Sequence, residues 1–531
     1  MLLIVGLDGA TFDLLTPWMA AGHLPTMARL QQAGVSGVLA STVPPVTPPA
    51  WATFMTGKNP GQHGIFDFFQ PRSPDPDRPQ MVNATDMWAR PFWHHLSNAG
   101  RRVGVLNVPL TYPPSPVNGF IVPGLLSPDE GATTFPPDFL APYRAELGPY
   151  RLVPHLAYRP ERIDSFVAEL RQVTATQIAY ALRIAREHPT DFLMVHFFTP
   201  DLAQHKLWHT LDETHPWYRP ALAARLGTAV RDIFAQIDQG LEALLALLPG
   251  DTTVVLMSDH GFGPQHEVVN LNNYFLQTGV MALQTTARVR LRAWAARRQP
   301  VAGAAVRLSR LWGRERLLGF ADVDWSKTRA YARGHMGQVY LNLQGREPQG
   351  IVRPADYHAV RAEIVGLLQS LRWPDGSRPL IETIIPNEAV THGPYRQDGP
   401  DLHVIMAGYR ALAYPLFAAD GRLVTQQPLV DSGNHRPEGI FIAAGPPVRQ
   451  GGVVSGARLV DLAPTALHLL GVPPPDDMDG RVLTEIFTTE FNRQTPVTHQ
   501  PGQDGAATPL ALTDREQEHL TARLRALGYL G

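Results

Sequence analysis

Cysteine is absent from all 531 residues of the chain. A disulfide framework, a thiolate zinc finger, a cysteine-bound iron–sulfur cluster and a cysteine nucleophile are therefore excluded. Any metal ion must be bound by histidine, carboxylates, hydroxyls or backbone oxygens. The chain contains 20 histidines, so imidazole ligands are available.

The chain also lacks a strong net charge and a long hydrophobic run. Its 46 Lys and Arg against 48 Asp and Glu give a formal net charge of −2, which argues against broad electrostatic binding of nucleic acid. No apolar run reaches the roughly 18 residues that indicate a membrane-spanning helix. The opening run Leu2–Leu7 is too short for a signal-peptide core and has no basic segment before it, so we expect a cytoplasmic protein.

Apolar runs that alternate with helix-like stretches predict an α/β fold. With 44% hydrophobic and 18% charged residues, the composition is that of a globular protein. We expect buried strands at Leu2–Leu7, Val103–Leu106, Phe192–Phe198, Thr252–Met257, Leu402–Met406 and Gly439–Ala443. We expect helices at Pro25–Ala33, Ile163–Glu187 and within Arg219–Leu248. The alternation favours a mostly parallel central sheet with helices on both faces.

Composition divides the chain into a core, an insertion and a C-terminal extension. We assign the catalytic core to residues 1–262 and 398–488, and an inserted cap to residues 263–397. Within the cap, Leu283–Leu318 is rich in arginine. A solvated helix face is the simplest interpretation of this stretch. Contact with an anionic substrate, a partner or a membrane surface is the alternative.

Residues 489–531 are interpreted as a linker followed by a final helix. The stretch 488–509 is polar and rich in proline, glycine and glutamine, as linkers are. Thr513 and Glu516 have the spacing of a capping box, and an apolar stripe follows at Leu520, Leu524 and Leu527. We expect this stripe to dock on the body of the protein or on a second subunit, so the chain could form a homo-oligomer.

Acidic residues and histidines lie next to the ends of four predicted strands. Asp8 follows the first strand, and Asp259 and His260 directly follow another. Asp201 follows a third strand by a short loop, and His435 lies just before the last. Ligands of open α/β sheets bind at the carboxyl edge of the strands, so we expect a site there. For a single Asp, a role in a turn or a helix cap is the alternative.

Two further patterns point to phosphate chemistry. Asp201 and His205 are four residues apart, which places them on one face of a helical turn, close enough to share a metal ion. Thr47 precedes Pro48 and a helix that Gly57 would end, so we expect it to be the N-cap. A hydroxyl at a helix N-terminus stands where anions such as phosphate are favoured. A structural cap is the default interpretation, and a metal-activated nucleophile is the alternative.

Together these segments resemble the alkaline phosphatase superfamily, and most closely its type I phosphodiesterase/nucleotide pyrophosphatase branch. The resemblance covers nearly the whole chain, in order. It rests on Gly6–Gly9, Thr47–Gly57 with Pro60–Ile65, Asp201–His205, Ser258–Gly261, Gly433–Gly439 and Asp461–Gly480. The resemblance implies an alkaline-phosphatase-like core and hydrolysis of phosphoric esters.

The resemblance also implies two divalent metal ions and the residues that bind them. One ion would be bound by Asp201, His205 and His435. The other would be bound by Asp8, Asp259 and His260, with the nucleophile Thr47. The phosphodiesterase branch implies Zn²⁺, and a phosphoglycerate mutase-like relative implies Mn²⁺. Thr47 would form a phospho- or nucleotidyl-threonine intermediate with a small phosphate ester or nucleotide.

Substrate contacts are expected at four further positions: Ala50, Trp51, Asn107 and His209. The branch often has an asparagine where this chain has Ala50, which puts the nucleotide preference in doubt. A phosphomonoesterase or phosphotransferase, similar to phosphoglycerate mutase, is the alternative on the same site. A catalytically inactive binding or scaffold protein is a third hypothesis. For other histidines near the motifs, such as His63 and His196, a structural or surface role is expected.

Overall fold

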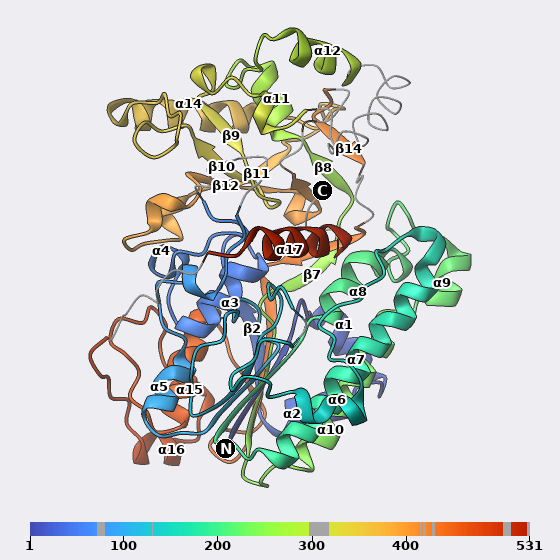
Figure 1. Cartoon of the computed structure of the whole chain (residues 1–531), viewed down its shortest axis with the longest axis vertical. Coiled ribbons are helices and arrows are strands. Elements are labelled where there is room, and N and C mark those ends of the chain that lie inside the picture. The colour runs from blue at the N-terminus through green and yellow to red at the C-terminus, as the bar shows by residue number, and fades with distance from the viewer. Residues whose placement is uncertain are drawn as a thin grey trace. The chain divides into compact units, whose positions relative to one another are not determined.

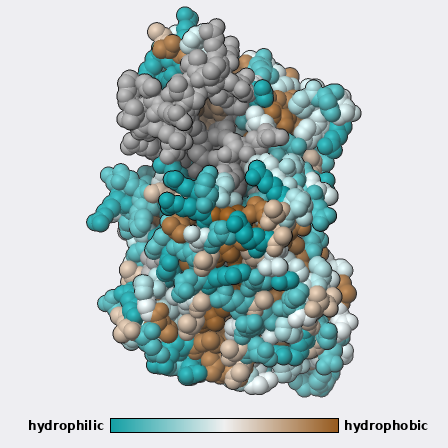
Figure 2. Space-filling model, turned by 90° about the vertical axis from the view of Figure 1, so that its right-hand side faces the viewer, coloured by the Kyte–Doolittle hydropathy of each residue, from teal (hydrophilic) through white to brown (hydrophobic). Residues whose placement is uncertain are grey.

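The chain folds into two compact units in a computed structural model. The structure describes residues 1–71, 80–129, 131–296, 318–414, 417, 421–426, 431–502 and 511–527. The first unit comprises Met1–Phe68, Met81–Pro264 and Leu429–Gly531, and the second comprises Phe69–Gln80 and Gln265–Pro428. Figure 1 shows the elements of both units, and Figure 2 shows one face, on which hydrophilic residues predominate among those described.

A nine-stranded sheet forms the centre of the first unit. Its strands, in spatial order, are β17 (Gly452–Val453), β2 (Val35–Ala40), β16 (Glu438–Ala444), β6 (Thr253–Met257), β1 (Leu2–Leu7), β5 (Phe192–Phe197), β3 (Val103–Leu106) and β4 (Gly119–Val122), and β18 (Ala457–Arg458) also pairs with β2. The strands from β6 to β4 are mutually parallel, whereas β16 runs antiparallel to both of its neighbours. The predicted α/β class with a mostly parallel sheet is confirmed.

Helices cover both faces of this sheet, as parallel strands with two buried faces require. Figure 1 shows α7 (Ile163–Glu187) and α10 (Ala229–Leu245) on one side, and α3 (Thr47–Thr56), α5 (Phe92–Asn98) and α15 (Leu462–Leu469) on the other. Further α-helices of this unit are α1 (Phe12–Ala20), α2 (Pro25–Ala33), α4 (Pro60–His63), α6 (Ala141–Leu147), α8 (Thr199–Leu207) and α9 (Pro220–Leu226), and two more lie in its C-terminal segment. The predicted stretch Arg219–Leu248 is two helices, because Gly227 ends α9.

The second unit contains two small sheets. One has the order β11 (Ile381–Pro386), β12 (Leu402–Met406), β10 (Gln338–Leu341) and β9 (Ala330–Ala332), and the other β13 (Ala411–Ala413), β8 (Glu267–Val269) and β14 (Val424–Gln426). Its described α-helices are α11 (Leu271–Gln277), α12 (Ala287–Ala296) and α14 (Tyr357–Ser370). Of the arginine-rich stretch, α12 is described; the arginines from Arg297 to Arg316 lie outside the described residues.

One predicted core strand lies in the second unit. Leu402–Met406 forms β12, which pairs antiparallel with β10 and β11 rather than joining the large parallel sheet. The prediction was wrong because an apolar run shows that a strand is buried but not which sheet buries it. The second unit accordingly extends to Pro428, beyond the predicted cap at 263–397.

The C-terminal extension is more ordered than a linker. Residues Thr489–Gln494 form α16, and the Thr488 side chain caps it by accepting a hydrogen bond from the Phe491 N–H at 3.2 Å. The predicted linker is therefore wrong over this part, and residues 503–510 lie outside the described residues.

The final helix α17 (Asp514–Leu527) is part of the first unit and packs against its body, where the Tyr112 hydroxyl donates to Glu516 at 2.7 Å. Thr513 and Glu516 form the expected capping box, with bonds of 2.8 and 3.3 Å. Its stripe, Leu520, Leu524 and Leu527, is at most 3% exposed. No helix among the described residues is long and apolar enough to cross a membrane.

Candidate metal centre

Six candidate ligands gather at the carboxyl edge of the large sheet. They are Asp8, Asp201, His205, Asp259, His260 and His435, and none is more than 6% exposed. Asp8 directly follows β1, and Asp259 and His260 lie between β6 and the short strand β7 (Gly261–Pro264). The helix α8 follows β5 and carries Asp201 and His205. His435 lies on β15 (Gly433–Arg436), which pairs antiparallel with β7 and so reaches the same edge.

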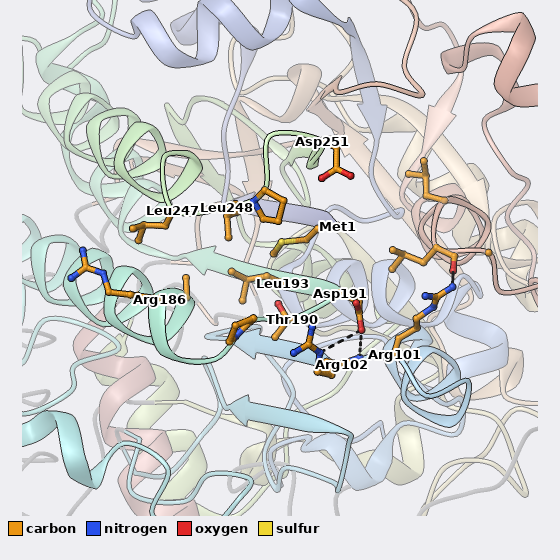
Figure 3. Close-up of a pocket in the computed structure, with 16 residues that line it drawn as sticks. Met1, Arg101, Arg102, Arg186, Thr190, Asp191, Leu193, Leu247, Leu248 and Asp251 are labelled. Carbon is orange, nitrogen blue, oxygen red and sulfur yellow. Dashed lines mark hydrogen bonds and ion pairs between the residues drawn. The ribbon is translucent and has the colours of Figure 1, made fainter.

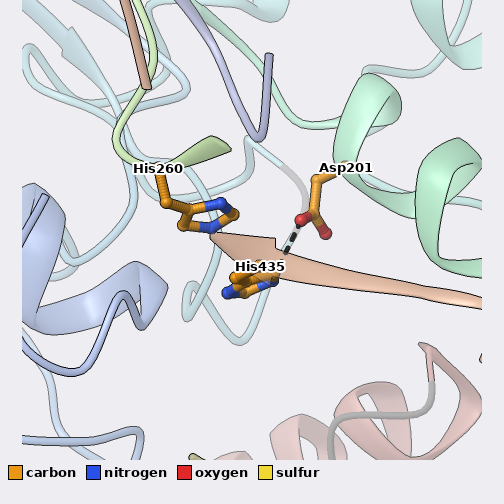
Figure 4. Close-up of side chains that lie close together, drawn as sticks. All are labelled: Asp201, His260 and His435. Carbon is orange, nitrogen blue, oxygen red and sulfur yellow. Dashed lines mark ion pairs between the residues drawn. The ribbon is translucent and has the colours of Figure 1, made fainter. Parts of the chain in front are cut away.

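Three of these side chains form a first group. His205 Nε2 is 3.0 Å from His435 Nε2. Asp201 Oδ1 is 3.2 Å from His435 Nε2 and 3.5 Å from His205 Nε2. Figure 4 shows Asp201 and His435 facing each other, with His260 beside them. The predicted set Asp201, His205 and His435 is thus brought together around one point.

The other three side chains form a second group, next to the first. His260 Nε2 is 3.2 Å from Asp259 Oδ2 and 3.6 Å from Asp8 Oδ1. The rings of His260 and His435 stack with centroids 3.5 Å apart, so the two groups adjoin. One potential ligand atom each from Asp201, His260 and His435 also lie within 4.8 Å of one another.

The spacing of these atoms fits tetrahedral metal binding. With ligand distances of about 2.0–2.1 Å around zinc, two ligand atoms lie about 3.3 Å apart. The separations given above range from 3.0 to 3.6 Å. Both groups therefore have the dimensions of a metal site formed by nitrogen and oxygen ligands.

The three imidazoles are already oriented with Nε2 inward. The Nδ1 atoms of His205, His260 and His435 lie 3.0, 3.1 and 2.8 Å from the backbone carbonyl oxygens of Gly433, Gly261 and Pro45. A carbonyl only accepts hydrogen bonds, so each Nδ1 carries the proton and donates. Each Nε2 then presents a lone pair to the centre, which is the arrangement that metal-binding histidines need.

The electrostatics of the centre also call for cations. Burial, followed by repulsion from Asp201, raises the pKa of Asp8 well above its usual value. Burial, followed by repulsion from Asp8 and Asp201, raises the pKa of Asp259 in the same way. Burial also acts on Asp201, but the neighbouring imidazoles, first that of His205, lower its pKa. Asp8 Oδ1 and Asp259 Oδ2 accept no hydrogen bond from any described residue. Bound cations would compensate these buried carboxylates.

Thr47 does not cap its helix. The helix α3 begins at Thr47 itself, and the N-cap is Val46, with no side-chain cap. The two residues after Thr47 are prolines, which have no N–H, and the next N–H, from Ala50, donates to the Val46 carbonyl at 3.0 Å. The predicted cap is therefore wrong, because no helix N–H is left for the hydroxyl. Thr47 Oγ1 instead lies 3.4 Å from His260 Nε2, at the second group.

A family model described as type I phosphodiesterase/nucleotide pyrophosphatase matches residues 2–408 of the chain. The chain belongs to this family. The predicted resemblance to the alkaline phosphatase superfamily and to this branch is confirmed. A sequence comparison with curated proteins gave no match.

Solved structures of similar fold include human ectonucleotide pyrophosphatase/phosphodiesterase 5, with a TM-score of 0.51 and 14% identity over 92% of this chain and 100% of that one. The murine protein, solved as an inactive variant in complex with AMP, has a TM-score of 0.50 and 13% identity over 92% and 99%. Phosphonoacetate hydrolase from Sinorhizobium meliloti 1021, in complex with phosphonoformate, has a TM-score of 0.51 and 16% identity over 87% and 94%. At these identities the likeness shows the fold.

As a member of the type I phosphodiesterase/nucleotide pyrophosphatase family, the chain is an enzyme that hydrolyses phosphoric ester bonds. The family is metal-dependent. In this member the second group, and Asp201 and His435 together with His260 or His205, are candidate metal ligands.

Three of the four side chains that we expected to contact the substrate form hydrogen bonds within the protein. Trp51 donates its indole N–H to Asp8 Oδ2 at 3.2 Å. Asn107 donates its amide to a carbonyl of β5 at 3.2 Å, and His209 Nδ1 is 3.0 Å from a serine hydroxyl just before β15. Ala50 is fully buried. A substrate contact by any of them stays a prediction.

A buried ion pair that the sequence did not reveal joins the two segments of the first group. Lys206, next to His205 on α8, pairs with Asp431, four residues before His435. The Lys206 ammonium also lies 5.8 Å from the ring centre of Tyr158. Because an ion pair joins residues far apart in the chain, sequence spacing gave no signal for it.

Figure 3 shows a pocket that lies away from the candidate metal ligands. Its volume is about 990 Å³, and it is lined by residues such as Met1, Asp191, Leu193 and Asp251. These residues lie at or before the amino ends of β1, β5 and β6, at the opposite edge of the sheet from the candidate ligands. This pocket is therefore not the metal centre.

Proposed function

We propose that the protein is a two-metal phosphodiesterase or nucleotide pyrophosphatase that acts through Thr47. The observation that carries the proposal is the convergence of six buried candidate ligands, with neighbouring pairs of ligand atoms 3.0–3.6 Å apart and the Thr47 hydroxyl 3.4 Å from His260 Nε2. Family membership supports the reaction class.

Each group of ligands would hold one divalent cation. Asp201, His205 and His435 would hold the first, and Asp8, Asp259 and His260 the second, together with Thr47. Mixed nitrogen and oxygen ligands suit Zn²⁺ and tolerate Mn²⁺, and zinc is the proposed native ion. When bound, the cations would favour ionisation of the threonine hydroxyl and offset negative charge on the phosphoryl oxygens.

Thr47 would then act as the nucleophile. Its Oγ forms a bond to phosphorus while the bond from phosphorus to the leaving oxygen breaks, and the departing alcohol or nucleotide takes up a proton. A water molecule next attacks the phosphorus, the bond to Oγ breaks, and the threonine hydroxyl is restored. The absence of a helix N–H that could bind the Thr47 side chain supports this role, because the hydroxyl is not engaged in capping.

The proposed substrate is a nucleotide-containing phosphodiester or pyrophosphate. The murine relative was solved with AMP, which is a product of such substrates. The test is to compare hydrolysis of bis(4-nitrophenyl) phosphate with that of 4-nitrophenyl phosphate, followed by nucleotide pyrophosphates. Faster turnover of the diester supports the proposal. A clear preference for the monoester would instead identify a phosphomonoesterase on the same site.

The nucleophile is tested with a matched pair of variants on one helix. Thr47→Ala should abolish turnover, whereas Thr56→Ala should retain it, because Thr56 is equally buried on α3 but bonds to the Ala52 carbonyl. Acid quenching during turnover should trap a phosphorylated peptide that contains Thr47. Elemental analysis should find two metal ions per chain. Full activity of Thr47→Ala, or no bound metal after reconstitution, would refute the proposal.

A further inference from the structure

Two buried side chains outside the ligand set contact the same oxygen of Asp8. His196 Nε2 lies 2.9 Å from Asp8 Oδ2, and the Trp51 indole N–H donates to the same oxygen at 3.2 Å. Neither His196 nor Trp51 is exposed to solvent, and their rings pack edge to face with centroids 4.6 Å apart. These two contacts therefore join three elements: β5, α3 and the end of β1.

A glycine in β1 leaves room for the Trp51 ring beside Asp8. In the parallel pairing of β1 and β5, Gly6 lies opposite His196, two residues before Asp8. A Cβ atom at Gly6 would approach the Trp51 ring to 2.6 Å, so only glycine leaves room for the indole there. The position of Trp51 beside Asp8 thus depends on the glycine at position 6 of β1.

A hydrogen-bond chain fixes which way His196 faces. Its Nδ1 lies 2.9 Å from the Asn107 carbonyl, which can only accept, so Nδ1 donates and Nε2 faces Asp8 Oδ2. The hydrogen bond between Nε2 and Oδ2 then uses one further proton, which the ring and the carboxyl share. The Asn107 side-chain amide donates in return to the His196 carbonyl at 3.2 Å, and the Tyr150 hydroxyl donates to the Asn107 side-chain oxygen. Asn107 has a φ of 66°, a left-handed conformation that asparagine tolerates better than most residues.

The two oxygens of Asp8 consequently have different environments. Oδ2 is occupied by two partners, whereas Oδ1 accepts no hydrogen bond from any described residue and lies 3.6 Å from His260 Nε2. We infer that His196 and Trp51 are positioning residues that hold Asp8 so that it binds a single cation through Oδ1 alone. The inference rests on the proposed function in that Asp8 is a metal ligand.

The consequence is a selective effect on one of the two cations. Partners that orient a metal-binding carboxylate typically change metal affinity or activity by about 10- to 100-fold. Removing the contact of His196 or of Trp51 should therefore lower the affinity for the cation bound by Asp8, Asp259 and His260 by that factor. The cation bound by Asp201, His205 and His435 should keep its affinity, because Asp8 is not one of its ligands.

The sharpest test is Trp51→Phe, which removes one N–H and keeps an aromatic ring. The matched control is Trp93→Phe, because Trp93 is 1% exposed and its indole N–H has no acceptor among the described residues. Stepwise zinc affinities of the full-length protein are measured by competition with a chromophoric chelator. Trp51→Phe should weaken one of two zinc ions about 10-fold or more and leave the other unchanged, and Trp93→Phe should change neither.

His196→Gln provides a second variant, with His403→Gln as its control, because His403 is 2% exposed but lies in the second unit. The visible spectrum of the cobalt-substituted protein should change in His196→Gln and not in His403→Gln. If His196→Gln fails to fold, the zinc affinities of Trp51→Phe decide. Two zinc ions bound with wild-type affinity by Trp51→Phe would overturn this inference alone. Failure of the wild-type protein to bind zinc would overturn the proposed function as well.

Discussion

The buried ion pair between Lys206 and Asp431 gives a prediction of stability that can be worked from the structure. The two side chains are 3% and 5% exposed, so neither charge is solvated when its partner is removed. Breaking such a pair from one side costs about 3–5 kcal/mol, because an unpaired charge stays buried. Lys206→Met and Asp431→Leu should each destabilise the first unit by this amount.

The double variant separates the ion pair from other effects. Replacing both charges by apolar groups leaves no buried charge, and such replacements are often close to neutral. Lys206→Met/Asp431→Leu should therefore be more stable than either single variant. The free energy of unfolding is measured by urea titration of the metal-free protein, and the coupling is obtained from the double-mutant cycle.

The control cycle uses Arg29 and Glu242, whose side chains are 56% and 57% exposed. Exposed pairs of this kind contribute about 0–1 kcal/mol, so little coupling is expected. Additive losses at Lys206 and Asp431, with no more coupling than in the exposed pair, would refute the argument. The same single variants should also weaken metal binding, because the pair connects the segments that carry His205 and His435.

Three further predictions follow from buried residues. Burial lowers the pKa of His63 to about 3. Below pH 6.5 the unfolded chain therefore binds a proton that the folded protein does not bind until the pH approaches 3, and the folded state loses stability over this range. His63→Gln should remove about 2 kcal/mol of the loss in the free energy of unfolding measured between pH 8 and pH 5. Leu524→Ala, at 0% exposure on α17, should cost about 2–5 kcal/mol, whereas Leu291→Ala, at 64% exposure, should leave the free energy of unfolding nearly unchanged. Gly6→Ala should displace Trp51 and cost about 1–3 kcal/mol, measured by denaturation, with lower zinc affinity.

Much of the sheet could be predicted because its strands are buried on both faces. Leu2–Leu7 is a continuous apolar run, and β1 has these bounds. By contrast, β2 (Val35–Ala40) was not predicted, because Ser36 and Gly37 interrupt its apolar pattern. The assignment of Leu402–Met406 to the wrong sheet shows the same limit, since pairing partners are set by the tertiary fold.

The candidate ligands could be predicted because strand ends converge at one edge of a parallel sheet. Asp8, Asp259 and His260 follow apolar strands directly, so topology alone brings them together. The role of His196 could not be seen, although it lies in the predicted strand Phe192–Phe198. Its contact with Asp8 depends on the register of β5 against β1, which the sequence does not specify.

The order in which the ligands occur along the chain bears on how the protein acquires its metal during synthesis. The first group needs His435, and the second needs ligands from Asp8 to His260. At about 5–20 residues per second, roughly 9–35 s separate the synthesis of His260, the last ligand of the second group, from that of His435. With the proposed ligand sets, the second group would be complete while the first still lacks His435, and the two ions would be captured in sequence rather than together. Cellular metal supply in that interval would then decide which ion enters first.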